Sequence, residues 1–595
     1  MCRIAGIANH PLPFPEAEEK VRKMCELQQH GGPDDKGFYS CAQHNIVLGH
    51  RRLALIDLSP SGHQPMIYNS RYIISFNGEI YNFPELKEQL KQSGMYFNTE
   101  CDTEVILAAF AKWNTHSFHK LKGMFAFALF DQQEKQLYLV RDPSGIKPLY
   151  YSIQDGAIEF SSEIRAFTVF NKQENTNWPV YQLAYGHLPE PVTTLNNVQP
   201  LHKGCFLQYD LSSKNISYQS FTHYSFSNWF KDPAATNTTV HSSLHNAVGR
   251  HLLSDAPIGV FLSGGIDSSI ISTLAADFQH ENLKTLSIYF DDPRFSEKKF
   301  QDIVISRLQC KSYQHLLNSS EFYSSFPGIL QAMDMPSCDG INTWFISKYA
   351  KAEGLKAVLS GIGSDELFGG YPSFERMSIA SRLQKLPGFI KRSVKNSQLK
   401  KLSRVQYLSL EGTKGLYLFL RGHFVPAQIA HHLGASEKEI WNILREHPMG
   451  VPLRTLADKN KASWMEMNLY MQNQLLRDAD VMSMAHGVEI RVPFMDDEVV
   501  RTTLSIDSSI KYAGTVRKQI LIDAFKSRFP DAIWNREKMG FSFPFQKWLS
   551  QSEFVRDTME KSNKTARDTY KKFSEGKLHW SHLMSLLILR VRGAI

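Results

Sequence analysis

The feature that most constrains the fold of this chain is a strand, loop and helix in direct succession near its middle. An apolar run, Pro257–Leu262 (PIGVFL), passes straight into the loop SGGIDSS at Ser263–Ser269, and a helical stretch, IISTLAADF, follows. The two glycines let the backbone approach an anion, and the hydroxyls and helix N-terminal N–H groups supply donors. The string predicts a phosphate-binding turn on a buried strand. A tight turn without a ligand is the alternative, which the complete string disfavours.

The loop does not match the commonest phosphate-binding motif, because no Gly-Lys-Ser/Thr follows its glycines. Asp267 would repel a phosphate unless a Mg²⁺ ion lay between them, so the loop also predicts magnesium.

Hydrophobic patterns on either side of the loop differ. After it, the apolar runs Lys284–Phe290 and Lys356–Leu359 alternate with helical stretches, which indicates a parallel sheet, and helical patterns dominate from about residue 370. The first ~200 residues instead hold short β-type runs between turn residues, with a helix near Pro84–Ser93, which indicates an antiparallel sheet. These runs are Arg71–Phe76, Gly123–Asp131, Gln136–Arg141 and Ala157–Phe160.

At 595 residues the chain is too long for one core, so we expect two domains. Residues 211–240 are rich in Ser, Thr and Asn and lack clear periodicity, which predicts a linker. The predicted division is therefore residues 2–210, a linker at 211–240, and residues 241–595.

The composition limits the classes of ligand and the cellular location that we expect for this chain. The net charge of +8 is mild; it suits small anionic ligands and does not indicate nucleic acid. No apolar run approaches the ~18–20 residues of a membrane span, and the first residues are not a signal peptide, so we expect a cytoplasmic protein. The seven cysteines form no C-x-x-C pair and are interpreted as reduced thiols. The basic run Arg382–Arg404 is interpreted as a solvated helical face, and a metal site at His241 and His245 is disfavoured.

Further segments carry a family resemblance. The SGGxDSS loop resembles the pyrophosphatase loop of synthetases that adenylate their substrates. Leu359–Tyr371 (LSGIGSDELFGGY), Asp478–Asp496 and Arg536–Phe541 (REKMGF) resemble further blocks of the asparagine synthetase family. The resemblance implies an α/β parallel-sheet synthetase domain that binds ATP and Mg²⁺.

That resemblance also implies roles for single residues. Asp267 and Asp365 would hold Mg²⁺, and Lys538 would be a catalytic lysine that neutralises charge as pyrophosphate leaves. The implied ATP-binding residues are Leu262, Ser263, Gly264, Gly265, Asp267, Ser268, Ser269, Ile288, Ser360 and Gly361.

Cys2 directly follows the initiator methionine. Methionine is removed before small residues, and its removal would leave a cysteine with a free α-amine. An amine of reference pKa ~7.7–8.0 can act as the base for its own thiol. A cysteine at this position predicts a nucleophile only if other features accompany it.

Other segments do accompany it. Gly49–Asp57 (GHRRLALID), Asn77–Asn82 (NGEIYN), Asp102–Glu104 and Arg141–Tyr151 resemble, in order, the class II glutamine amidotransferase domain. That domain implies an Ntn-type αββα sandwich in which Cys2 is the nucleophile. Arg52 would bind the α-carboxylate of glutamine and Asp102 its α-ammonium, Asn77 and Gly78 would form the oxyanion hole, and Glu79 would line the pocket. Asn77-Gly78 is also predicted to be a turn after the Arg71–Phe76 strand.

Together the segments cover the chain from Cys2 to about Trp548, and on them the chain is identified as a member of the glutamine-hydrolysing asparagine synthetase family. The resemblance implies that glutamine supplies ammonia, through an enclosed route, to aspartate activated as an acyl-adenylate. Products would be asparagine, glutamate, AMP and pyrophosphate. Amidation of a different small carboxylate, or a non-catalytic homologue, remains an alternative. A homodimer is a candidate assembly.

One position departs from the family. Many asparagine synthetases read S-G-E-G-S-D-E in the second loop, whereas this chain has Ile362 in place of the glutamate. Isoleucine can neither move a proton nor attract an ammonium group. Either the neighbouring charges suffice, or the pocket accepts a larger or less polar carboxylate than aspartate.

Overall fold

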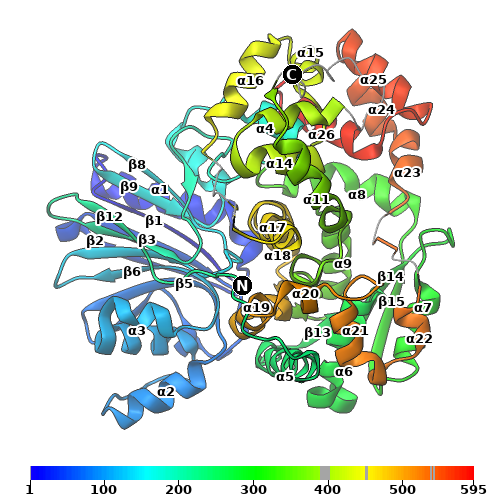
Figure 1. Ribbon diagram of the computed structural model, residues 1–595. Helices are drawn as coiled ribbons and strands as arrows, with labels where there is room; N and C mark the ends of the chain where they lie inside the picture. The colour runs from blue at the N-terminus through cyan, green and yellow to red at the C-terminus, as the bar shows by residue number, and fades with distance from the viewer. Residues whose placement is uncertain (1, 389–402, 449–452, 454, 537–538, 541–542) are drawn as a thin grey trace.

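The computed structural model describes residues 2–388, 403–448, 453, 455–536, 539–540 and 543–595. Two antiparallel sheets stack at one side of the molecule, and a parallel sheet surrounded by helices forms the other side (Figure 1). Within the described residues, no helix is both long and apolar enough to cross a membrane.

The N-terminal half is a four-layer sandwich. Its first sheet has the strand order β10-β8-β9-β1-β3-β2 and its second the order β12-β11-β7-β6-β5-β4. The strands are β1 (Arg3–Ala8), β2 (Asp35–Cys41), β3 (Ile46–Arg52), β4 (Met66–Tyr68), β5 (Tyr72–Ile80), β6 (Gly123–Asp131), β7 (Gln136–Arg141), β8 (Tyr150–Gln154), β9 (Ala157–Ser161), β10 (Gln199–Pro200), β11 (Cys205–Asp210) and β12 (Ile216–Ser220).

Alternation of side chains across each strand produces separate apolar layers. Ile4, Leu48 and Ala128 belong to a core whose members come from both sheets. Val21 on α1 (Phe14–Leu27) packs with residues of the first sheet, and Val105 on α3 (Asp102–Trp113) packs with residues of the second. Helix α2 (Phe83–Gln92) joins the second of these outer layers. The expected αββα sandwich is confirmed.

The C-terminal half contains a five-stranded sheet of order β15-β14-β13-β16-β17, in which every neighbouring pair is parallel. Its strands are β13 (Ile258–Phe261), β14 (Lys284–Tyr289), β15 (Lys311–Leu316), β16 (Ala357–Leu359) and β17 (Glu489–Arg491). From β13 the chain proceeds to one edge of the sheet and then returns to fill the other. The loops after β13 and β16 therefore diverge at a topological switch point, where open α/β sheets bind ligands.

Helices surround this sheet and fill the end of the chain (Figure 1). The α-helices not yet given are α4 (Trp178–Tyr185), α5 (Pro233–His251), α6 (Ile266–Gln279), α7 (Lys298–Ile305), α8 (Ser319–Ala332), α9 (Ile341–Ala352), α10 (Ser364–Phe368), α11 (Pro372–Gln384), α14 (Gly412–Arg421), α15 (Pro426–Leu433), α16 (Glu437–Glu446), α17 (Asp458–Met465), α18 (Arg477–Met484), α19 (Asp497–Leu504), α20 (Ser508–Lys511), α21 (Gln519–Phe525), α22 (Asp531–Trp534), α23 (Phe545–Gln551), α24 (Glu553–Glu560), α25 (Lys564–Ser574) and α26 (Trp580–Val591). A π-helical stretch, Glu466–Leu476, joins α17 to α18.

Two local predictions differ from the structure. The segment 211–240, predicted as a linker, contains strand β12 and the first part of helix α5. Polar residues dominate β12 because it is an edge strand with exposed faces, so it lacks an apolar run. Asn77-Gly78, predicted as a turn, lies inside β5 opposite Ala126 and Phe125, because pairing with β6 continues to Ile80. Most of the basic run Arg382–Arg404 lies outside the described residues.

Candidate active sites

Cys2 lies immediately before β1, the central strand that joins β9 to β3. Its side chain is buried, and the thiol donates to the Leu53 carbonyl at 3.9 Å. Burial raises the pKa of the thiol to about 11, so the thiol is protonated at neutral pH. Any nucleophilic role for Cys2 therefore requires a base.

Arg52 and Glu79 lie within electrostatic reach of this thiol. After burial, the charge of Arg52 lowers and that of Glu79 raises the pKa of Cys2. Arg52 ends β3 and is 6% exposed, and its guanidinium donates to the carbonyls of Asp57 and Ser59, the latter at 3.0 Å. These contacts fix the guanidinium beside the thiol on the loop after β3.

Asn77, on strand β5, has an unusual buried side chain. Its side chain is fully buried, yet neither the amide nitrogen nor the amide oxygen has a hydrogen-bond partner in the described part of the chain. Buried amides are nearly always hydrogen-bonded, so the Asn77 amide has hydrogen-bonding capacity that a ligand or a water molecule can use. The next residue, Gly78, has φ +152°, and a Cβ there would stand 2.1 Å from the Met124 carbonyl oxygen. Only glycine fits at this point of β5.

Asp102 supplies an acidic group at the start of α3. It is 5% exposed, and its Oδ2 accepts the Ile80 N–H at 3.0 Å. Burial raises the pKa of Asp102 to about 6, although the N–H donors of Ile80 and Thr103 oppose the shift. After burial and the charge of Glu489, the charge of Asp102 also raises the pKa of Glu79, so Asp102 belongs to the same cluster. The structure therefore brings Cys2, Arg52, Asn77, Gly78, Glu79 and Asp102 to one region.

A second site lies at the carboxyl ends of the parallel strands. A cavity of about 840 Å³ opens there, between the loop after β13 and the loop after β16. Among the residues singled out from the sequence, its walls contain Leu262, Ser263, Gly265, Asp267, Ser268, Ile288, Ser360, Gly361, Ile362 and Asp365.

Gly264 and Ser269 support this wall instead of lining it. Gly264 holds the turn with φ +85°, and its carbonyl accepts from Arg536 at 3.0 Å. The Ser269 hydroxyl donates back to the Gly265 carbonyl at 2.7 Å. Neither residue faces the cavity.

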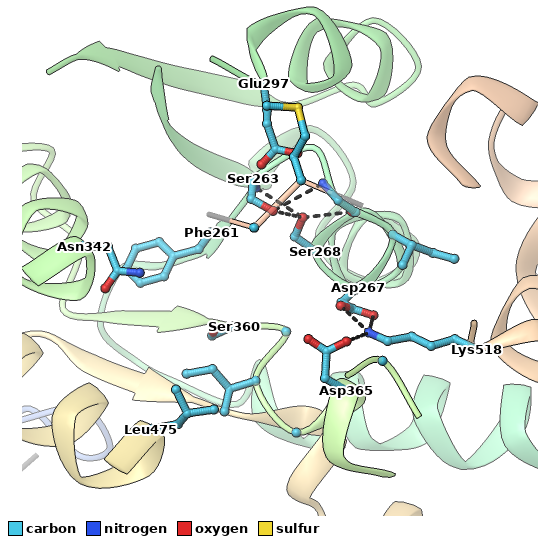
Figure 2. A pocket seen from close by; sticks show the side chains of 18 of the residues that line it. Phe261, Ser263, Asp267, Ser268, Glu297, Asn342, Ser360, Asp365, Leu475 and Lys518 are labelled. Carbon is cyan, nitrogen blue, oxygen red and sulfur yellow. Dashed lines mark hydrogen bonds and ion pairs between the residues drawn. The ribbon is translucent and has the colours of Figure 1, made fainter. Parts of the chain in front are cut away.

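The turn after β13 is closed by its own serines. The hydroxyls of Ser263 and Ser268 lie 3.0 Å apart, and Gly265 N–H donates to the Ser263 hydroxyl at 3.3 Å (Figure 2). Helix α6 begins at the next residue, Ile266, so its first N–H groups lie beside the same turn. This arrangement can bind an anion such as a phosphate.

Asp267 and Asp365 meet at a buried lysine. The Lys518 ammonium lies 2.7 Å from an Asp267 oxygen and 2.5 Å from Asp365 Oδ1 (Figure 2). Burial opposes the charge on Lys518, but the two carboxylates outweigh burial and raise its pKa. Gly361 allows the two loops to approach this closely, because a Cβ there would stand 2.9 Å from Asp267 Cβ.

Lys518 was not found from the sequence. It immediately precedes α21 with φ +60°, and no motif surrounds it in the chain. Only the tertiary packing of α21 brings it to the two aspartates, so no sequence signal could have identified it. Lys538, singled out from the sequence, lies outside the described residues.

Glu366 follows the second loop and is nearly fully buried. It accepts the Tyr371 hydroxyl at 2.8 Å. Burial, with the charge of Asp365 adding to it, raises the pKa of Glu366 to about 7. A carboxyl group of this kind, in the wall of the cavity, can exchange a proton near neutral pH.

The two sites are joined by Arg491 at the end of β17. Its guanidinium lies 2.6 Å from Glu489 and 3.6 Å from Glu79 of the thiol site. Its backbone carbonyl accepts the Ser360 N–H, in the wall of the cavity, at 2.8 Å. One fully buried residue therefore touches both sites.

Comparison with known proteins agrees with this arrangement. A glutamine amidotransferase domain model matches residues 1–222, and an asparagine synthase model matches residues 239–582. With its antiparallel sandwich and parallel-sheet domain, the chain is an enzyme of the glutamine amidotransferase class. More particularly, it belongs to the glutamine-hydrolysing asparagine synthase family.

Relatives of similar length carry different names. Glutamine-hydrolysing asparagine synthetase 1 of Bacillus subtilis is 31% identical over 590 residues, which cover 95% of this chain and 91% of that protein. A putative asparagine synthetase of Mycobacterium bovis is 29% identical, covering 91% of this chain and 86% of that protein. Amidase chry2 of Gibberella zeae is 24% identical, covering 92% and 90%. Full-length similarity therefore does not by itself select one acceptor.

Proposed function

We propose that this enzyme hydrolyses glutamine at Cys2 and uses the ammonia to amidate a carboxylate that it first adenylates with ATP. The observation that carries the proposal is the double contact of Arg491. Its guanidinium lies 3.6 Å from Glu79 of the thiol site, and its carbonyl accepts the N–H of Ser360 in the wall of the cavity. A glutaminase and an adenylating site that share one buried residue suit the transfer of ammonia between them.

At the first site Cys2 is the nucleophile. Its own α-amine, freed by removal of Met1, takes the thiol proton, because the buried thiol with pKa about 11 cannot ionise unaided. The thiolate attacks the amide carbon of glutamine, and ammonia leaves with the proton held by the amine. Water then cleaves the thioester to glutamate.

The neighbouring residues bind and orient the substrate. Arg52 pairs with the α-carboxylate of glutamine, Asp102 pairs with its α-ammonium, and Glu79 lines the pocket. The unpaired Asn77 amide and the Gly78 N–H donate to the oxyanion of the tetrahedral intermediate. Removing one such donor typically costs ~10²–10³ in kcat.

At the second site the acceptor carboxylate attacks the α-phosphorus of ATP and displaces pyrophosphate. Ammonia then attacks the acyl carbon, and AMP leaves. The turn Ser263–Ser269 binds phosphate oxygens, while Leu262, Ile288, Ser360 and Gly361 contact the adenosine. Lys538 and Lys518 neutralise charge as pyrophosphate leaves.

Asp267 and Asp365 fit a magnesium site. Two carboxylates that converge on one cation in the structure have the donor chemistry that Mg²⁺ prefers, with phosphate oxygens completing the shell. Bound there, Mg²⁺ would offset the charge of the pyrophosphate.

Aspartate is the leading acceptor, with asparagine as the product. A different small carboxylate is the second candidate, because Ile362 lines the cavity at the position where the family resemblance implies a glutamate. A non-catalytic homologue is disfavoured, because Cys2, Asp267, Asp365 and Lys538 are all present.

Pyrophosphate release across a panel of carboxylates tests this proposal. With glutamine and Mg·ATP, the acceptor should release pyrophosphate and glutamate in a 1:1 ratio, and mass spectrometry should find its amide. Aspartate should be compared with glutamate, with monocarboxylic amino acids and with apolar acids of similar length. Hydrolysis of glutamine with no acceptor-dependent pyrophosphate anywhere in the panel would contradict adenylation.

A further inference from the structure

The amide-forming step proposed for the second site releases a proton. Ammonia carries three hydrogens and the amide nitrogen keeps two, so one proton leaves as the C–N bond forms. Ile362 stands in the cavity wall where the family resemblance implies a glutamate, and its side chain cannot accept a proton. A base for this step therefore has to come from another part of the cavity wall.

Helix α18 lies between the thiol site and the cavity. Arg3, next to Cys2, forms a buried ion pair with Asp480 of α18 at 3.0 Å, and Lys147 of the sandwich lies 3.3 Å from the same carboxylate. Asp478, two residues earlier, lines the cavity. Neighbouring residues of an α-helix are ~100° apart, so Asp478 and Asp480 point to well separated faces. Asp478 is therefore on the cavity side of the helix that separates the source of ammonia from the second site.

Hydrogen bonding and packing hold the Asp478 side chain in place. The residue is 6% exposed, and its carboxylate accepts a hydrogen bond from the Ser337 hydroxyl. Gly340, which has φ +91° and lines the same cavity, packs against it, because a Cβ on this glycine would stand 3.2 Å from Asp478 Cβ. A carboxylate has about four lone-pair sites, so Asp478 can accept from Ser337 and still accept from a molecule in the cavity.

The surroundings of Asp478 bring its proton affinity close to neutral pH. Burial raises the pKa of Asp478 to about 7, and the charge of Asp339, just before α9 in the cavity wall, acts in the same direction. The Arg477 guanidinium, 3.8 Å away, and the Ser337 hydroxyl oppose the rise. A carboxyl group with a pKa near the working pH is suited both to accept a proton and to release it again.

We propose that Asp478 is the catalytic residue that accepts the proton when ammonia attacks the acyl-adenylate. The nitrogen forms its bond to the acyl carbon while one of its protons passes to the Asp478 carboxylate. The bond between the acyl carbon and the phosphate oxygen of AMP then breaks, and AMP leaves with the electron pair. Asp478 returns the proton to solvent before the next turnover. This inference rests on the proposed function of the second site.

Asp478→Asn tests the inference, because asparagine keeps the shape of the side chain but cannot take up the proton. Ammonium salts supply the nitrogen and so bypass Cys2, and the acceptor is aspartate or whichever carboxylate of the panel releases most pyrophosphate. Amide formation should fall about 10²-fold or more, the usual contribution of a general base. Adenylation, measured as exchange of labelled pyrophosphate into ATP, should stay close to the unmodified rate, because it needs no base at this position.

The pH profile separates proton transfer from a structural role. At a fixed concentration of free ammonia, kcat of the unmodified enzyme should fall as pH drops through about 7, because a protonated Asp478 cannot accept a second proton. Asp478→Asn should lack this step. Ser337→Ala removes a hydrogen bond that favours the ionised carboxylate, so its step should move to higher pH. Hydroxylamine in place of ammonia should restore part of the rate of Asp478→Asn, because this less basic nitrogen gives up its proton to water more readily once attached.

Asp458→Asn is the matched control. Asp458, on α17, also accepts a serine hydroxyl, from Ser381 at 2.9 Å, but it is not among the described residues that line the cavity. This variant should keep both the rate of amide formation and the step in the pH profile. Calorimetric binding of Mg·ATP shows whether each variant is folded, and the pH profile of Ser337→Ala decides the question if Asp478→Asn does not fold.

The possible results separate the two claims. If no carboxylate supported pyrophosphate exchange by the unmodified enzyme, the proposed function and the inference would both fail. If exchange occurred but Asp478→Asn formed the amide at the unmodified rate, or kept the step near pH 7, only the inference would be wrong. Loss of exchange together with amide formation in a folded Asp478→Asn would assign the residue to substrate binding and would also overturn the inference.

Discussion

At the scale of single residues, Asp102 should make kcat/KM for glutamine at the thiol site depend on pH. Burial raises its pKa to about 6, above the ordinary value for an aspartate. Below this pH the carboxyl group is protonated and no longer attracts the α-ammonium of glutamine, so kcat/KM for glutamine should fall as pH drops through about 6. Bound ammonium lowers the pKa, so kcat should not show this step.

Asp102→Asn supplies the control for that pH profile. The variant should raise KM for glutamine and lose the step near pH 6, because asparagine does not titrate. A step that persists in Asp102→Asn would assign the titration to another group.

We expect Ile362, which lines the cavity, to weaken the binding of a charged acceptor. An apolar wall leaves a polar group of aspartate unpaired, at a cost of roughly 1–3 kcal/mol. We therefore expect aspartate, if it is used, to bind weakly, and Ile362→Glu to lower its KM by about 5- to 150-fold, the equivalent of that energy. Pyrophosphate release at varied aspartate concentrations measures the effect.

Ile362→Leu is the matched control, because it changes shape while leaving the wall apolar. It should leave KM for aspartate close to that of the unmodified enzyme. Tight and fast turnover of aspartate by the unmodified enzyme would overturn the preference for a less polar acceptor and leave plain asparagine synthesis.

At the scale of elements, strand β5 depends on one glycine. Alanine at Gly78 would place a Cβ 2.1 Å from the Met124 carbonyl oxygen and would force a side chain into a φ of +152°. Such backbone strain costs about 1–3 kcal/mol, and overpacking adds a similar amount. Gly78→Ala should therefore lower the free energy of unfolding and suppress glutaminase activity, as measured by urea denaturation and glutamate release.

Gly94→Ala separates strain from the clash. Gly94 also has a positive φ, +81°, but nothing lies within 4 Å of its added Cβ. It should lose stability through strain alone and keep its glutaminase activity. Equal loss of activity in both variants would show that the close approach of β5 and β6 is not what matters.

Apolar runs between turn residues were sufficient to predict β5, β6, β7, β9, β13, β14 and β16, and the helix α6. Strand β15 was missed because its sequence, KSYQHL, lies at the sheet edge and is only partly buried. Strand β17 was missed because it has three residues, too few for a pattern. The family resemblance of the two loops indicated Asp267 and Asp365, but no pattern indicated Lys518 or Arg3, since partners far apart in the sequence give a single basic residue its role.

At the scale of the whole molecule, the two sites should be separable by substitution. Cys2→Ala should abolish synthesis from glutamine and preserve synthesis from ammonium salts, because adenylation uses no thiol chemistry. Lys518→Met should instead impair the second site and leave glutamine hydrolysis intact. It removes the buried ammonium that pairs with the partly buried carboxylates of Asp267 and Asp365, so synthesis from either nitrogen source should fall while glutamate release persists.

Cys41→Ala is the control for Cys2→Ala, because Cys41 is a half-buried free thiol at the end of β2. It should keep both activities. Glutamine-driven synthesis by Cys2→Ala at the unmodified rate would refute the assignment of the nucleophile.

The late position of β17 in the chain sets an order of assembly. During synthesis the sandwich strands, residues 3–220, emerge well before β17 (Glu489–Arg491). About 130 residues separate β16 from β17, its neighbour at the edge of the sheet. Pairings so distant in sequence form slowly, since a long loop must close first. When β17 does add to the sheet, Arg491 arrives beside Glu79 and the same event completes both sites. A chain that ends before β17 would therefore lack both contacts of Arg491, so neither site would have its complete set of neighbours until synthesis of the protein is nearly finished.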